Sequence, residues 1–241
     1  MLKGIAASEG IGIGRAVIIA PQEITYQTGP VADIEQEKAR LHRAIDDFIS
    51  YTEELAGKLE ETLDAENADI IRGHVTMLSD PFMIEEMEEL IAGGQSAEAA
   101  AESVLDMFQG LFQSAEDELT RQRATDVEDI KRKLLEILLG MEQLDLKHLP
   151  DHTVLVVSDL APSVTAEMDH DSVIGVVTEN GGMTSHSAIL SRALEIPAVL
   201  SVPDALSKIK DGQKLIVDGT NGTVIVDPSA ETTVKYQTCR D

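Results

Sequence analysis

A histidine follows two glycines and two hydroxyl residues in the segment 181–186. The apolar run 173–177 predicts a strand before it, and the residues up to Leu194 predict an amphipathic helix after it. His186 is therefore expected in the first helical turn, where backbone N–H groups lack intrahelical partners and the helix dipole favours an anion. Histidine can act as a covalent nucleophile, and glycine lets the backbone approach a bulky anion closely. This pattern favours a histidine that carries a phosphoryl group.

The same residues also suit an ordinary capped helix start, with Thr184 or Ser185 as the N-cap. Ser185 and His186 are neighbours that point apart on a helix, so they cannot form a nucleophile–base pair, and the chain has no G-x-S-x-G elbow. A metal site would require a second histidine at helical spacing, as in H-E-x-x-H, and no such histidine is present. From the residues alone, phosphoryl transfer and simple helix capping both stay open.

A longer stretch around this histidine carries a family resemblance. Residues 181–198 read Gly-Gly-x-Thr-Ser-His-x-x-Ile-Leu-x-Arg-x-Leu-x-Ile-Pro-Ala. This resembles the phosphohistidine signature of enzyme I of the bacterial phosphoenolpyruvate:sugar phosphotransferase system. Pyruvate phosphate dikinase and phosphoenolpyruvate synthase carry a related form of this signature. Segments 3–11, 123–130 and 159–163 also resemble enzyme I and keep its order. The resemblance implies an enzyme in which His186 is phosphorylated at Nε2 and passes the group reversibly to the histidine of the phosphocarrier HPr.

Composition limits the class of protein. The chain has 241 residues, of which 43% are hydrophobic and 3% aromatic, which suits a helix-rich protein with an aliphatic core. Its net charge of -25 argues against nucleic-acid binding and suits attraction of a basic partner. Cys239 is the one cysteine, so no internal disulfide can form. No apolar run approaches the roughly 20 residues that span a bilayer, and the N-terminus lacks a signal-peptide core. We therefore expect a cytoplasmic protein without membrane insertion.

The first half of the chain predicts a β segment followed by a helical bundle. Gly10, Gly12 and Gly14 alternate with apolar residues, but the G-x-G-x-x-G spacing of dinucleotide sites fails, which favours a glycine-rich strand or hairpin. From about residue 33 to Gly140, apolar residues recur at steps of three and four, as in an antiparallel bundle. We expect Asp80 to cap a helix that has Pro81 at its first position, and Gly93 and Gly94 to form a turn after it. Ser96 is expected to cap the next helix, which carries Val104, Phe108, Leu111, Ala115 and Leu119. A last helix is expected to bury Val127, Ile130, Leu134 and Ile137 and to end at Gly140.

After Pro150, short strands alternate with short helices, which is typical of an α/β domain. The expected strands are 154–157, 173–177, 198–200, 215–217 and 223–226, and the expected helices are 162–168 and 187–194. The resemblance implies an α/β phosphohistidine (swivelling) domain with an inserted all-α helical-bundle domain that binds HPr. The domains expected are 1–21 plus 150–230 for the α/β domain, 32–143 for the bundle, and 231–241 for the start of a linker to a further domain.

The resemblance also assigns roles around the histidine. Thr165 matches the threonine that hydrogen-bonds the active histidine in enzyme I, and Thr184 and Ser185 would offer donors to the phosphoryl oxygens. Family members often have threonine where this chain has Ala161, which removes one hydroxyl. Arg192 lies too far along the helix to share its first turn, and we expect it to serve packing or an ion pair.

A second candidate surface lies in the expected bundle. Glu66, Ile70, His74 and Met77 share one helix face, and Asp80 and Met83 continue it past the proline. Such a stripe is usually core with a solvated rim, yet Ile71, Val75 and Leu78 already supply a second apolar face. The resemblance implies that the Glu66 face docks HPr, with Arg123 on a neighbouring helix pairing with it.

Two other classes of protein fit parts of the sequence. One is the swivelling phosphohistidine domain of a dikinase-like enzyme, which usually lacks the long insertion between Pro21 and Pro150. The other is a non-catalytic acidic binding module. Enzyme I continues into a C-terminal barrel that binds phosphoenolpyruvate and Mg²⁺ and dimerises. Because the sequence stops at Asp241, we expect a monomeric segment without cofactor that exchanges phosphate with HPr only, with Mg²⁺ and a homodimer expected for the full-length enzyme.

Overall fold

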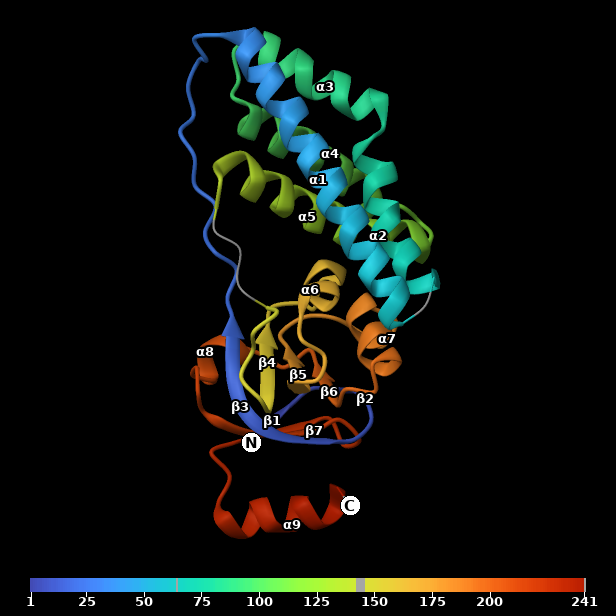
Figure 1. The fold of residues 1–241 in the computed structure, drawn as a ribbon, viewed down its shortest axis with the longest axis vertical. Coiled ribbons are helices and arrows are strands. Elements are labelled where there is room, and N and C mark those ends of the chain that lie inside the picture. Colours follow the sequence, from blue (N-terminus) through green and yellow to red (C-terminus); the bar gives the residue numbers. More distant parts are fainter. Residues whose placement is uncertain (64, 142–145, 241) are drawn as a thin grey trace. The chain divides into compact units, whose positions relative to one another are not determined.

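The computed structural model describes residues 1–63, 65–141 and 146–240, which fold as a mixture of helices and strands (Figure 1). The α/β character expected from the sequence is therefore confirmed. The chain divides into two compact units, residues 1–22 with 145–241 and residues 23–144. The predicted domain boundary at residue 143 lies outside the described residues.

The first unit is built on one eight-stranded sheet with the order β1-β8-β7-β3-β4-β5-β6-β2. Three neighbouring pairs are parallel, namely β3 with β4, β4 with β5, and β5 with β6. The other four pairs are antiparallel. The bounds are β1 Leu2–Lys3, β2 Ile5–Ser8, β3 Ile11–Ile19, β4 Thr153–Val157, β5 Val173–Thr178, β6 Ala198–Leu200, β7 Lys214–Asp218 and β8 Thr223–Val226.

Alternation along β4 explains how the sheet is covered on both faces. Leu155 and Val157 belong to one apolar cluster, and Val154 and Val156 belong to another, because successive strand residues point to opposite faces. Helix α7 (His186–Ala193) contributes Ala188 to the first cluster, and α8 (Ala205–Lys208) contributes to the second. Helix α6 (Pro162–Glu167) lies between β4 and β5 in the chain.

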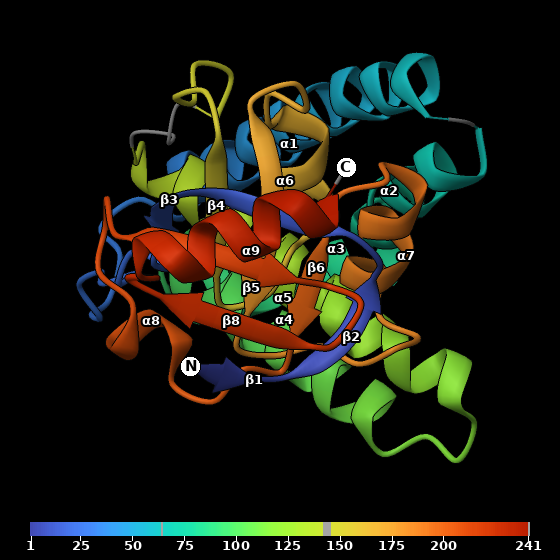
Figure 2. The same ribbon diagram turned by 90° about the horizontal axis from the view of Figure 1, so that it is seen from below.

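The glycine-rich N-terminal segment is a strand and not a hairpin, since β2 pairs with β6 while β3 pairs with β4 and β7. A Cβ at Gly12 would lie 2.1 Å from the carbonyl oxygen of Ile174, and one at Gly14 would lie 2.0 Å from that of His152. Close approach of neighbouring backbone therefore requires these glycines. At the other end, residues 231–240, expected as the start of a linker, form most of α9 (Ala230–Arg240), which packs against β3 (Figure 2).

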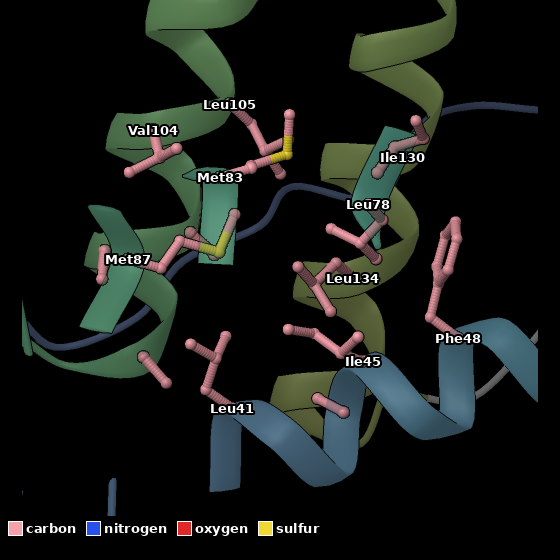
Figure 3. Packing of buried hydrophobic residues seen from close by; sticks show 14 of the residues in the cluster. Leu41, Ile45, Phe48, Leu78, Met83, Met87, Val104, Leu105, Ile130 and Leu134 are labelled. Atoms are coloured by element: carbon pink, nitrogen blue, oxygen red, sulfur yellow. The ribbon is translucent and has the colours of Figure 1, made fainter. Parts of the chain in front are cut away.

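The second unit is helical over its described residues. Its helices are α1 Ile34–Thr62, α2 Ala65–Leu78, α3 Pro81–Ala92, α4 Ala97–Gln113 and α5 Glu118–Leu139. Side chains from all five helices meet in one core, including Phe48, Leu78, Met87 and Leu134 (Figure 3).

Local signals set the helix ends. Asp80 accepts a hydrogen bond from the Phe82 N–H with Pro81 at the first helical position, and Ser96 accepts one from the Ala99 N–H. Gly140 ends α5 in the left-handed conformation, at φ 61°. These three predictions are confirmed. The single helix expected through Leu119 is wrong, because α4 ends at Gln113 and Asp117 caps a new helix.

Candidate functional site

His186 lies at the edge of the sheet where parallel strands end. Strands β4 and β5 are parallel, so the loops that follow them emerge at the same edge, which is where open α/β sheets bind ligands. The loop after β4 leads into α6, and the loop after β5 leads into α7. These two short helices contact each other.

Hydrogen bonds shape the loop between β5 and α7. The Asn180 N–H donates to the Ser158 carbonyl at 2.9 Å, and the Ser201 hydroxyl donates to the Gly181 carbonyl. Gly181 adopts a φ of +99°, and a Cβ there would lie 3.2 Å from the Ser185 Oγ, so glycine is required. A Cβ at Gly182 would meet no described atom within 4 Å, which leaves open space beside the loop.

His186 lies in the first turn of α7, as predicted, although the helix begins at His186 and not at Ser187, and Ser185 is its N-cap. The Ser185 Oγ accepts from the Ala188 N–H at 3.3 Å and donates to the Gly182 carbonyl at 2.7 Å. Thr184, the other cap candidate, is exposed. His186 is half-buried, and its Nδ1 atom is buried. One nitrogen of the ring therefore faces inward at the capped start of the helix.

Thr165 lies in α6 and is fully buried. Its hydroxyl donates to the Ala161 carbonyl at 3.3 Å, and its own carbonyl accepts from the His170 ring at 2.8 Å. Ala161 occupies the N-cap position of α6 and provides no side-chain hydrogen bond there. The hydroxyl proton of Thr165 is thus directed into its own helix, and the pairing with His186 that the resemblance implies stays a prediction.

The predicted partner face on α2 and α3 needs correction at two residues. His74 is 3% exposed, with its Nε2 3.5 Å from Asp126 Oδ1 and its Nδ1 3.7 Å from Asp129 Oδ2, both on α5. Met83 is 2% exposed and belongs to the helical core. Neither side chain can line an exposed surface, because packing of α2 and α3 against their neighbours turns both inward.

The remaining predicted partner residues are at least partly accessible. Glu66 and Arg123 are exposed, and Ile70 is half-buried. Met77 is half-buried and packs against the helical core, so its loss would also disturb packing. Asp80 is exposed, with its carboxylate engaged as the cap of α3.

Comparison with known proteins assigns the chain to a family. The model of the N-terminal domain of the PEP-utilising enzymes matches residues 3–123, and the model of their mobile domain matches residues 149–222. The chain belongs to the PEP-utilising enzymes. Within this family, it is 35% identical over 237 residues to the phosphoenolpyruvate-protein phosphotransferase of Listeria monocytogenes, covering 98% of the chain and 41% of that protein. The Bacillus subtilis phosphoenolpyruvate-protein phosphotransferase is 37% identical over 237 residues, covering 98% of the chain and 42% of that protein.

Two solved structures show the same fold. An NMR solution structure of Enzyme I matches with a TM-score of 0.83 at 35% identity, covering 100% of this chain and 98% of that one. The N-terminal domain of Enzyme 1 - Nitrogen matches with a TM-score of 0.65 at 25% identity, covering 99% of each chain. The resemblance to the N-terminal part of enzyme I is thereby confirmed, and the chain spans about two fifths of the length of these curated relatives.

The matches to the two family models divide the candidate residues of this chain between them. The mobile-domain match contains His186, Thr165, Thr184 and Ser185, and the N-terminal match contains the α2 face and ends at Arg123. Among the described residues, no helix is both long and apolar enough to cross a membrane. In that same part of the chain, no three His, Cys, Asp or Glu side chains are grouped to hold a metal ion.

Sequence reasoning missed an aromatic cluster that has one exposed ring, while its other two rings are partly buried against the helical core. Phe82 is 55% exposed, and its ring lies edge-on to Phe108 at a centroid distance of 6.2 Å. The Phe108 ring lies 6.5 Å from that of Phe112, and Leu111 beside them is 59% exposed. The signal available in the sequence was Phe82 directly after the proline, in a chain with only four phenylalanines.

Sequence reasoning also missed what holds the start of α7. The Ser187 hydroxyl donates to Asp159 Oδ1, and Arg192 donates from Nη1 to the Ala7 carbonyl and from Nη2 to the Met183 carbonyl, each at 3.2 Å. Arg192 therefore ties the last turn of α7 to the loop before it, which agrees with the packing role expected for it.

Proposed function

We propose that this chain is the phosphoryl-relay part of an enzyme I, in which His186 carries a phosphoryl group and exchanges it reversibly with the histidine of HPr. The observation that carries the proposal is a half-buried histidine at the capped start of α7, beside the carboxyl ends of the parallel strands β4 and β5, within a mobile-domain match of the PEP-utilising enzymes. The first unit would be the phosphohistidine (swivelling) domain, and the helical unit an inserted HPr-binding domain.

The first turn of α7 suits the charge of a phosphoryl group. Backbone N–H groups there point along the helix axis, and the dipole places a positive partial charge at His186. The Nδ1 atom of His186 is buried, so Nε2 is the nitrogen proposed to bond to phosphorus. The open space beside Gly182 would admit the phosphoryl oxygens close to the backbone.

The proposed transfer balances without a co-reactant. The N–P bond to His186 breaks as a new N–P bond forms to the HPr imidazole, so His186 regains a nitrogen lone pair and the acceptor gives one up. Both bonds are of the same type, so the protein mainly has to align donor and acceptor in line. Thr184 would add a donor to the phosphoryl oxygens, while Ser185 would hold the helix start as its cap.

The partner surface is proposed on exposed and half-buried residues of the helical unit. Ile70 and the exposed ring of Phe82 would provide apolar contacts, and Glu66 and Arg123 would provide charged contacts at the rim. The net charge of -25 favours a basic partner and would speed its approach. His74 and Met83 are no longer part of this surface.

The remaining proposals concern the whole enzyme, of which this chain would be one part. Phosphoenolpyruvate would phosphorylate His186 with the aid of Mg²⁺ bound elsewhere in the whole enzyme, which we expect to be a cytoplasmic homodimer. The residues of this chain would receive, hold and pass on the phosphoryl group.

Transfer from labelled phospho-HPr tests the proposal. Incubation with ³²P-phosphorylated HPr should place an acid-labile, alkali-stable label on the chain, and peptide mass spectrometry should locate it on His186. His186→Gln should take up no label. The matched control His148→Gln changes an exposed histidine of the same unit and should label as the wild type does. Absence of label, or label retained in His186→Gln, would refute the proposal.

A further inference from the structure

We propose that Ser187 and Asp159 form a positioning pair that fixes the ring of His186 for phosphoryl transfer. The inference rests on the proposed function and adds two residues to the machinery of that site. Ser187 follows His186 directly in α7 and is 1% exposed. Its hydroxyl donates to Asp159 Oδ1, and its oxygen accepts from the Leu160 N–H at 3.3 Å.

The pair joins two loops that leave the same sheet edge. Asp159 lies just after β4, and Ser187 is the second residue of the helix that follows β5. Nearer the sheet, the Glu179 N–H donates to the Val157 carbonyl at 3.2 Å, and the Asn180 side chain donates to the Ser158 Oγ at 3.1 Å. Beyond Asn180, the hydrogen bond between Ser187 and Asp159 again links the segment after β5 to the segment after β4.

Helix α7 needs such an anchor because it is short. It has eight residues, and isolated helices of that length are unstable in water, so tertiary contacts must set the direction of its first turn. Successive residues on a helix point about 100° apart, so a bond made by Ser187 holds the backbone of His186 without covering its ring. The pair also ties α7 to the loop that starts α6, where Thr165 lies.

Another buried serine of α7 provides a contrast. Ser191 lies one turn further along and is 0% exposed, but its Oγ makes no hydrogen bond within the described residues. Loss of either hydroxyl removes one buried oxygen from the same helix. Only the loss of the Ser187 hydroxyl would release the first turn from Asp159.

Single-turnover transfer from phospho-HPr tests the pair in the whole chain. Ser187→Ala should slow transfer about tenfold, because a small displacement of a reacting group costs that much or more. The Kd for HPr, measured by calorimetry, should not change, because the proposed partner surface lies in the other unit. Ser191→Ala should match the wild type in both. The double variant Ser187→Ala, Asp159→Ala should be no slower than the slower single variant, as expected for residues that act together.

A spectroscopic measurement separates this inference from the function on which it rests. The ¹⁵N chemical shifts of the His186 ring should change in Ser187→Ala and stay at the wild-type values in Ser191→Ala. If the wild type exchanges no phosphate with HPr, the proposed function fails, and the ring shifts alone decide the positioning claim. Transfer by Ser187→Ala within twofold of the wild type, equal slowing in Ser191→Ala, or unchanged ring shifts would each overturn the pair.

Discussion

The two units of this chain each place a histidine on a helix, and the two side chains have opposite surroundings. His186 is half-buried at the first position of an eight-residue helix. His74 lies inside α2, is 3% exposed, and has an aspartate of α5 near each ring nitrogen. Residue type and helical position looked functional in both cases. Burial and charge separate them: the ring of His186 is partly accessible, and the ring of His74 lies between two helices.

Electrostatics give His74 its role. Burial lowers the pKa of His74, but the interaction with Asp126 and the charges of Asp129 and Asp126 raise it by more, so the pKa lies above the ordinary value of 6.5. The two carboxylates therefore favour the protonated form of the ring, and their contacts with it link α2 to α5. Removal of one member of such a buried group leaves the other charges uncompensated.

The largest effect we predict therefore falls on the stability of the helical unit. His74→Leu should destabilise it by about 3 kcal/mol, because Asp126 and Asp129 would lose their buried counter-charge. Amide hydrogen exchange of α2 and α5 in the whole chain measures the loss. The matched control is His42→Leu, which breaks the exposed pair with Glu88 in the same unit and should change stability by less than about 1 kcal/mol. Equal effects of the two variants would remove the distinction between His74 and a surface histidine.

A smaller effect should fall on partner binding, and it sharpens the distinction between the buried His74 and the more accessible residues near it in sequence. Phe82→Ala and Ile70→Ala should each weaken HPr binding about tenfold, as expected when an apolar anchor of an interface is truncated. Titration calorimetry measures the affinity. Val234→Ala, which truncates an apolar side chain that is 60% exposed on α9, should bind as the wild type does. Unchanged affinity in both Phe82→Ala and Ile70→Ala would move the partner surface elsewhere.

The helix and strand boundaries were largely predictable because local signals determine them. Strands 198–200 and 223–226 match the structure at both ends, and the caps at Asp80 and Ser96 do as well. The break between α4 and α5 was not predictable from glycine or proline, since residues 114–117 contain neither. The structure shows where α5 begins, because Asp117 caps it by accepting a hydrogen bond from the Thr120 N–H.

The surroundings of the candidate residues were less predictable than the elements. A helical pattern places His74 and Met77 on one face of α2, but the packing of α5 decides which of them is enclosed. The bond between Ser187 and Asp159 joins residues 28 positions apart, and no spacing rule connects them. Periodicity gives the face of a helix, and only the tertiary arrangement shows what that face meets.

The pH dependence of stability gives a third test of the two histidines. A folded-state pKa above the unfolded value means that His74 stabilises the folded state fully below about pH 6.5, and that this stabilisation is lost as the pH rises through the folded pKa. After correction for the intrinsic exchange rate, hydrogen-exchange protection of α2 should therefore fall as the pH rises through the folded-state pKa of His74. His74→Gln should flatten this dependence, while His186→Gln should leave it as in the wild type. A slope that persists in His74→Gln would assign the dependence to other groups.

The smallest effect we predict concerns the α/β unit, where α6 begins without a side-chain cap. Ala161 has the extended backbone of an N-cap residue, at φ -63° and ψ 148°, but it offers no hydroxyl to the first turn. Ala161→Thr should therefore stabilise this unit by about 0.5–1 kcal/mol, since a threonine at this position can accept a hydrogen bond from a first-turn N–H. Hydrogen exchange of the α6 and β4 amides, measured at increasing urea concentrations, gives the change in stability. Ala161→Val has a similar shape and no hydroxyl, so it should give no gain, and equal stabilisation by threonine and valine would show that packing and not capping is responsible. Because the helical unit contains neither residue 161 nor α6, its exchange should stay constant in both variants.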